Sequence, residues 1–258
     1  MKRKQVKKMA IKPILFNTEM VRAILNGRKS CTRRLVRLQP DEKHTYPLGF
    51  VTDSTEKKEV GCFGFGIDEY GGSIQYAKSP YQPGDILYVR ETWRVGAWDI
   101  FNQMIAFDYK DGTCGELTYI HDQELFERLV NQSREDARKA KCDYNGVDFV
   151  WEKGKSPCRW HPSIYMPKEA ARIWLKVTDV RVERLQEITE DGAKAEGANF
   201  KNGKNVGFEE KMNRTAIERF VDIWNSTIKK SDRDIYDWDA NPYVFVIEFI
   251  RIDKPEEI

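Results

Sequence analysis

Segments with the residue pattern of β-strands fall into two groups in this chain, one in each half, and helix-like segments separate them. Apolar, β-branched and aromatic residues predict strands at Ile86–Arg90, Gln103–Tyr109, Ile173–Val182 and Tyr243–Ile250. Strands and helices do not alternate regularly, so the pattern disfavours a doubly wound parallel sheet. We therefore expect an α+β fold, in which helices flank a small closed sheet.

The N-terminal part predicts a strand followed directly by a short helix. Ile11–Phe16 has the composition of a strand, and the four apolar residues between 20 and 25 form one face of a helix. Asn17 or Thr18 is a suitable N-cap, and Gly27 is a suitable residue after the C-cap. The residues after Gly27 therefore follow a helix end directly.

Three more helices are expected further along the chain. Asp122–Lys141 is strongly charged, which predicts an exposed helix. Thr189 can cap a short helix that runs through Glu196, and Gly197 can end it. Asn213 is expected to begin another helix, whose apolar residues share one face.

The length of 258 residues suits one domain with long insertions. We expect residues 1–9 to be a disordered basic N-terminal arm and residues 10–258 to form the single domain. Residues at about 39–80 are rich in Gly, Asp, Lys and Ser, and we expect one hairpin there. A second insertion is expected at about 110–157.

Net charge, cysteine spacing and hydropathy argue against a general polyanion-binding protein, a disulfide-stabilised protein and a membrane-spanning protein. Lys and Arg total 43 and Asp and Glu total 41, so the net charge of +2 gives no general affinity for polyanions. The five cysteines are widely spaced and include no CxxC pair, which favours a reducing cytoplasm over a disulfide framework. No apolar run approaches the roughly 20 residues of a membrane span, so no membrane partner is expected.

Motifs for metals and cofactors are weak in this sequence. Cys158 and His161 form a CxxH half-site without an obvious second half, so we predict no metal site. The sequence contains no Gly-rich phosphate loop, GxSxG or HExxH motif. We accordingly expect no cofactor.

The segment after the first helix carries the most specific motif. Residues 27–34 read Gly-Arg-Lys-Ser-Cys-Thr-Arg-Arg. This segment resembles the signature of ASCH domains, Gly-x-Lys-x-x-Glu-x-Arg, with matches at Gly27, Lys29 and Arg34. Thr32 departs from the Glu of many members, but small bacterial ASCH proteins that act as N4-acetylcytidine amidohydrolases are similar here and also carry Thr.

The resemblance continues in pieces that cover about a third of the chain. Pro83–Val89 is similar to the strand entry of the family and Tyr243–Phe249 to its last strand. Thr178–Gly197, which ends in Ala195-Glu196-Gly197, is similar to its strand followed by a short helix. Val-Arg-Glu-Thr-Trp and Ser-Ile-x-Met-Pro resemble motifs of longer ASCH-like proteins of bacteriophages and prophages. The resemblance implies a PUA-like barrel whose cleft binds RNA or a modified nucleoside.

For the small amidohydrolases, the resemblance implies that Lys29, Thr32 and Glu196 are the catalytic residues. Hydrolysis of a cytosine amide needs a nucleophile, a proton shuttle and a group that holds the oxyanion. Thr32 offers a hydroxyl, and Lys29 can act as a base or stabilise the oxyanion. Glu196 can transfer a proton to the leaving amine or activate water. Each of the three also has a plain structural interpretation as a solvated or strand residue.

Arginines next to this motif are candidates for contacts with phosphates. Arg28, Arg33 and Arg34, with Arg37 nearby, form a basic cluster that suits an RNA-binding cleft. The alternative is a surface strand that carries charge on its outer face.

Glu91 and Trp93 are candidates for contacts with a base. Glu91 can accept a hydrogen bond from the N4 group of cytosine, or it can form an ion pair with Arg90 or Arg34. Trp93 can stack on a base or fill the core, and the same alternatives apply to Trp98, Trp160 and Tyr165.

Three functions remain open from the sequence. The first is an enzyme that acts on RNA or modified nucleosides, with hydrolysis of an N4-acetylcytidine-like amide as the reaction. The second is a non-catalytic module that binds RNA or a modified base. The third is a phage accessory protein whose insertions bind another protein.

Overall fold

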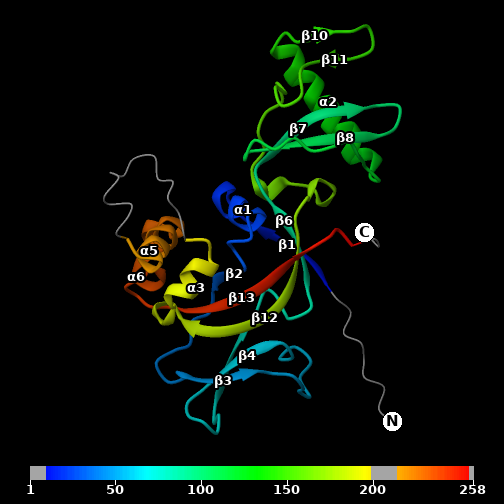
Figure 1. Cartoon of the computed structure of the whole chain (residues 1–258). Helices are drawn as coiled ribbons and strands as arrows, with labels where there is room; N and C mark the ends of the chain where they lie inside the picture. The colour runs from blue at the N-terminus through cyan, green and yellow to red at the C-terminus, as the bar shows by residue number, and fades with distance from the viewer. Residues whose placement is uncertain (1–9, 199–213, 256–258) are drawn as a thin grey trace. The chain divides into compact units, whose positions relative to one another are not determined.

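A computed structural model describes residues 10–198 and 214–255 of the chain, and Figure 1 shows its helices and strands. The largest sheet has five strands in the order β1-β6-β12-β13-β2. These strands are β1 (Ile11–Leu15), β6 (Ile86–Arg90), β12 (Trp174–Arg184), β13 (Tyr243–Ile252) and β2 (Cys31–Leu35). β2 lies at one end of this order and pairs with β13 in antiparallel fashion.

Three smaller sheets complete the β-structure of the described residues. One consists of β3 (Tyr46–Phe50), β4 (Cys62–Gly66) and β5 (Ile74–Lys78), and another of β7 (Trp93–Asp99), β8 (Met104–Tyr109) and β9 (Thr118–Tyr119). A two-stranded ribbon joins β10 (Asp143–Tyr144) and β11 (Phe149–Val150). The pairings within these sheets are antiparallel.

The α-helices are α1 (Thr18–Leu25), α2 (Gln123–Lys139), α3 (Glu190–Ala195), α5 (Ala216–Thr227) and α6 (Arg233–Tyr236). Short 3₁₀ helices are η1 (Ser163–Tyr165), η2 (Lys168–Ala170), η3 (Leu185–Glu187) and η4 (Lys230–Asp232). None of the helices in the described ranges combines the length and apolar character needed to cross a membrane.

Contacts divide the chain into two compact units. Unit 1 contains the chain up to Lys12, Ala23–Ile86 and Leu175–Ile252, and unit 2 contains Pro13–Arg22, Leu87–Trp174 and the residues from Asp253 onward. The two units are described separately below.

One apolar cluster of unit 1 holds α3 and α5 against the five-stranded sheet. Its buried members come from β2, β13, the two helices and the segments next to α3, namely Cys31, Leu185, Ile188, Ala193, Ala198, Ala216, Phe220, Trp224, Val244 and Val246. Glu190 of α3 strengthens this contact because its carboxylate accepts hydrogen bonds from the first N–H groups of α5, at Ala216 and Ile217. The short helix α3 is therefore fixed beside β2.

Most predicted elements are confirmed. Ile86–Arg90 is a strand as expected, and the last strand extends to Ile252. The Asn17 side chain accepts from Met20 N at the start of α1, and the Thr189 side chain accepts from Gly192 N at the start of α3. The helix expected from Asn213 begins at Ala216, with Thr215 as its N-cap, and Asn213 itself lies outside the described residues.

Two expectations need correction. The segment at about 39–80 contains a three-stranded sheet and not one hairpin, and β4 is buried along its whole length. Glycines at 64 and 66 interrupt the aromatic alternation of this strand and weaken its sequence pattern. α2 is not exposed all round, because Phe126, Leu129, Val130, Ser133 and Ala137 are buried.

The α+β class is confirmed by this arrangement of several sheets and fewer helices. A closed barrel is not detected within residues 10–198 and 214–255, so the PUA-like identity stays a prediction. The basic arm expected at residues 1–9 falls outside the described residues.

Candidate functional site

Lys29 and Glu196, which are 167 positions apart in the sequence, form a buried ion pair in unit 1. Lys29 Nζ donates to Glu196 Oε2 at 2.5 Å and to the Glu196 main-chain oxygen at 2.9 Å. The side chains are 0% and 6% exposed. Two of the three predicted catalytic residues are thus in direct contact.

Two chain turns bring these residues together. Lys29 N donates to Ala23 O, and this bond folds the chain back onto α1 after Gly27, whose φ is +69°. Gly197 ends α3 with φ +87°, and a Cβ atom there would lie 3.0 Å from Ala23 Cβ and 3.4 Å from Lys29 Cβ. Gly197 therefore allows a backbone conformation and a close approach that other residues resist.

The second oxygen of Glu196 binds the outer edge of β2. Arg33 N donates to Glu196 Oε1 at 2.5 Å, and Ser30 N donates to Ala195 O at 2.9 Å. Because β2 ends the strand order, its outward N–H groups have no neighbouring strand. The C-terminal end of α3 satisfies this edge and at the same time fixes the carboxylate.

The Arg33 side chain is not exposed to solvent. Its guanidinium is 2% exposed and donates to Glu183 Oε1 at 2.6 Å. A longer contact of 3.4 Å joins it to Glu196 Oε1, and the group lies 5.7 Å from the centre of the Phe220 ring. In this conformation Arg33 orders the carboxylates and is closed to a phosphate group from solvent.

Thr32 is buried, with 1% of its surface exposed. It directly precedes Arg33, whose N–H holds Glu196, and it pairs with Ile247 of β13. Side chains alternate along a strand, so Thr32 points to the face of β2 opposite that of Cys31 and Arg33. The structure brings Thr32 into the same segment as the pair but does not give it a direct bond to either partner.

Cys31 lies beside the pair and is chemically quiet. Burial raises the pKa of its thiol to about 12, and the negative charge of Glu196 contributes to the rise. The thiol therefore stays protonated near neutral pH and is a poor nucleophile.

The remaining arginines of the motif are only partly exposed. Arg28 and Arg34 are half-buried, and burial lowers the pKa of Arg34 while the nearby Glu196 carboxylate opposes this effect. Arg37 is exposed, and its main-chain oxygen accepts from the Tyr236 hydroxyl. The predicted basic cluster is therefore not one continuous exposed surface.

Glu91 belongs to unit 2, where it forms a bidentate ion pair. Arg172 Nε and Nη2 donate to its two oxygens at 2.8 and 2.9 Å, and Nη2 also donates to Asp111 at 2.8 Å. We call these three residues the Arg172 network. The partner of Glu91 is thus Arg172, and not Arg90 or Arg34 as considered from the sequence.

The Arg172 network is electrostatically tight. Burial raises the pKa of Glu91, an effect that Arg172 partly offsets. Burial alone would lower the pKa of Arg172, but its bonds to Glu91 and Asp111 raise that pKa above its ordinary value. The Arg172 guanidinium also lies 4.0 Å from the centre of the Tyr109 ring. Both oxygens of Glu91 accept from Arg172 and the side chain is 2% exposed, so in this conformation Glu91 is closed to a base.

Trp93 fills the core of unit 2, and its rings are not an open stacking surface. It is 2% exposed, stacks on His161 at 4.6 Å and meets Phe107 edge-on at 5.5 Å. The other aromatic candidates differ: Trp98 meets Trp151, Trp160 lies near Arg94, and Tyr165 is 72% exposed.

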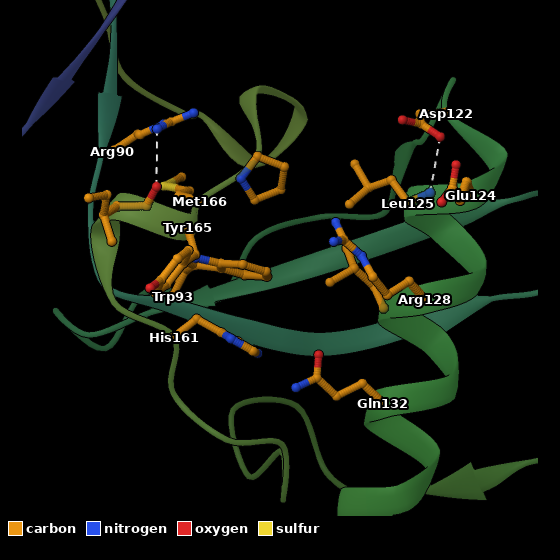
Figure 2. A pocket seen from close by; sticks show the side chains of 13 residues that line it. Arg90, Trp93, Asp122, Glu124, Leu125, Arg128, Gln132, His161, Tyr165 and Met166 are labelled. Atoms are coloured by element: carbon orange, nitrogen blue, oxygen red, sulfur yellow. Dashed lines mark hydrogen bonds between the residues drawn. The ribbon is translucent and has the colours of Figure 1, made fainter.

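A cavity of about 640 Å³ lies between η1 and α2 within unit 2. Figure 2 shows Arg128 and Gln132 reaching from α2 toward the wall that holds Trp93, His161 and Tyr165. Arg90 and Met166 belong to the same wall, and Asp122, Glu124 and Leu125 border the cavity at the first turn of α2. We call this cavity the η1–α2 pocket. Tyr165 and Trp93 were considered from the sequence, whereas Arg90 as a lining residue and Arg128 were not.

Metal ligands do not gather in the described part of the chain. A search of these residues found no group of three or more His, Cys, Asp or Glu side chains with the geometry of a metal site. All five cysteines are free thiols, and the Cys158 thiol lies 4.0 Å from Ser133 O.

The geometry of unit 1 thus offers a buried Lys–Glu pair at a strand edge, and that of unit 2 a bidentate ion-pair network and a pocket. Comparison of the chain with models of known protein families, with curated proteins and with solved structures found no match.

Proposed function

We propose that the chain is an ASCH-type, PUA-like protein that acts on modified nucleosides or RNA, and that it hydrolyses the amide of N4-acetylcytidine-like substrates. The observation that carries this proposal is the contact of Lys29 Nζ with Glu196 Oε2 at 2.5 Å. This contact joins Lys29 and Glu196, which lie in separate parts of the sequence resemblance, as a buried cation and carboxylate.

The pair has the chemistry that amide hydrolysis needs. Glu196 takes a proton from water, the water oxygen adds to the acetyl carbonyl, and the Lys29 ammonium stabilises the resulting oxyanion. The C–N bond then breaks, Glu196 returns the proton to the N4 atom, and cytidine and acetate leave. Thr32, the residue before Arg33, positions the substrate. It is not the nucleophile in this scheme, because its buried hydroxyl forms no hydrogen bond to a strong base in the described residues.

Arg33 acts as a positioning residue in this scheme. Its main-chain N–H and its guanidinium both contact Glu196 Oε1, so the carboxylate keeps one orientation. Glu196 Oε2 accepts from Lys29 alone among the side chains of the described residues, so it keeps a second lone pair for water or substrate.

The test is the release of cytidine from N4-acetylcytidine by the purified full chain, followed by chromatography. Glu196→Gln keeps the shape of the side chain and an acceptor for Arg33 N, but it removes the base. We expect the variant to fold like the wild type and to lose turnover. Thr32→Val should raise KM more than it lowers kcat, since Thr32 positions the substrate and does not react. Wild-type turnover in Glu196→Gln would refute the proposal.

A non-catalytic module for RNA or a modified base is the second candidate. The burial of Lys29 and Glu196, 0% and 6% exposed, favours it, because a closed ion pair is also a structural element. A folded wild type without turnover that binds cytidine-containing RNA with a salt-dependent affinity would select this candidate.

A further inference from the structure

We propose that the η1–α2 pocket of unit 2 binds a nucleoside monophosphate, with the phosphate on Arg90 and Arg128 and the base on Tyr165. This inference does not rest on the amidohydrolase proposal, because all lining residues belong to unit 2 and the readout is binding. The cavity of about 640 Å³ is within the size range of sites for small molecules.

The charges of the pocket favour an anionic group. Arg90 donates to Ile164 O and the Tyr88 hydroxyl, and Arg128 is exposed on α2. Within the described ranges, neither arginine forms an ion pair with a carboxylate. Elsewhere in unit 2, Arg94, Arg134, Arg159 and Arg172 each bind an aspartate or glutamate. Arg90 and Arg128 therefore differ from these arginines and remain available for an oxyanion.

Two buried N–H groups in the same wall also lack acceptors. Trp93 Nε1 and Arg90 Nε are buried without a hydrogen-bond partner, although most buried polar groups in proteins have one. Both residues line the pocket. Neither atom is open to water in this conformation. His161 stays neutral near pH 7, because burial and the charge of Arg159 lower its pKa.

Tyr165 and the first turn of α2 supply contacts that suit a base. Tyr165 is 72% exposed and presents a ring on which a base can stack, and Leu125 adds an apolar surface from α2. Asp122 and Glu124 would repel a phosphate, but they can accept from an exocyclic amino group. Figure 2 shows Asp122 and Glu124 at the first turn of α2, apart from Arg90, so these carboxylates lie away from the arginine of the opposite wall.

The experiment is calorimetric titration of the full chain with adenosine 5′-monophosphate, adenosine and inorganic phosphate at constant ionic strength. Adenosine 5′-monophosphate differs from the cytidine substrates proposed for the Lys29–Glu196 pair. We expect it to bind at least about ten-fold more tightly than adenosine or phosphate alone, because it engages both walls.

Variants locate the site. Arg128→Ala and Tyr165→Ala change exposed side chains, so both variants should fold, and each should weaken binding about ten-fold. Arg138→Ala removes another exposed arginine of α2 that does not line the pocket, and it should leave the affinity unchanged. Equal affinities in Arg128→Ala and Arg138→Ala would overturn the proposal, and so would binding of phosphate or adenosine as tight as that of the nucleotide. Absence of nucleotide binding would overturn it too, whatever the hydrolysis assay shows.

Discussion

Unit 1 and unit 2 each bury a cation against a carboxylate, but with different geometry. In unit 1, Lys29 Nζ binds one oxygen of Glu196 and a main-chain carbonyl. In unit 2, the fork of Arg172 binds both oxygens of Glu91 and also Asp111. In unit 1, Lys29 and Arg33 N share one carboxylate, whereas in unit 2 one guanidinium joins two carboxylates.

This difference suits the Lys29–Glu196 pair to proton transfer and the Arg172 network to a structural role. An arginine guanidinium does not release its proton in proteins, whereas a lysine ammonium does so when its surroundings change. Glu91 is held bidentately by Arg172, a cation that does not give up a proton to a reaction. We therefore expect reactivity at the Lys29–Glu196 pair and rigidity at the Arg172 network.

The largest expected effect is loss of stability on removing Arg172. Arg172→Met leaves Glu91 and Asp111 without their cation, and their side chains are only 2% and 6% exposed. Breaking a buried ion pair by removing one partner costs about 3–5 kcal/mol, and two uncompensated carboxylates place this variant at the upper end. Urea denaturation measured by circular dichroism gives the free energy of unfolding.

Arg159→Met is the matched control for this variant. Arg159 also pairs bidentately with an aspartate of unit 2, Asp136, but its side chain is 47% exposed. The Asp136 side chain is 10% exposed, so this pair is partly open to solvent, and Arg159→Met should lose less stability than Arg172→Met because it leaves one carboxylate without its cation instead of two. Equal losses in the two variants would show that burial does not distinguish the Arg172 network.

Removing Lys29 should cost less stability and more activity. Lys29→Met leaves one buried carboxylate, Glu196, which keeps its bond from Arg33 N. We expect a loss of about 3 kcal/mol in the free energy of unfolding and loss of amide hydrolysis. Lys194→Met, which changes an exposed lysine of α3, should affect neither quantity. A Lys29→Met variant with normal turnover would remove the contrast between the two clusters.

Alkaline pH should affect the neighbourhood of the Lys29–Glu196 pair through Cys31. The folded state holds the thiol proton up to a pKa of about 12, whereas the unfolded chain releases it near pH 9.0. The stability due to this group is fully present below pH 9.0 and falls as pH rises toward 12. By about pH 10.5 the loss is about 2 kcal/mol.

The pH dependence of unfolding in wild type and Cys31→Ala tests this. Between pH 9 and 10.5, the free energy of unfolding of the wild type should fall by about 2 kcal/mol relative to that of Cys31→Ala. Cys142→Ala, at a half-buried cysteine of unit 2, serves as the control. A constant difference across this range would contradict the assignment.

The sequence contained enough information for the Lys29–Glu196 pair but not for the Arg172 network. The resemblance to the ASCH signature marks Lys29 and Glu196 as residues of one site, and the folded chain brings them into contact. Glu91 and Arg172 are 81 positions apart, and no local pattern links them. For the same reason the sequence suggested the wrong arginines for Glu91.

The fold shows the same division between local and distant information. Strands with a clear apolar or β-branched composition, such as β6 and β13, match their predicted ranges closely, whereas the three short strands β3, β4 and β5 stand where one hairpin is expected. The η1–α2 pocket was not predictable, since an irregular segment and a helix approach each other only in the folded unit.

The smallest expected effect concerns how each carboxylate is held in place. Glu196 follows the six-residue helix α3, whose first turn depends on the Thr189 side chain, whereas Glu91 follows strand β6. Thr189→Ala should cost about 1 kcal/mol of stability and lower kcat several-fold, because a loosened α3 moves Glu196 relative to Lys29. Thr215→Ala removes the corresponding cap of α5 and should cost similar stability with a smaller change in kcat. Equal kcat losses in the two variants would mean that α3 does not position the carboxylate, and that the reactivity expected of unit 1 depends on its core as a whole.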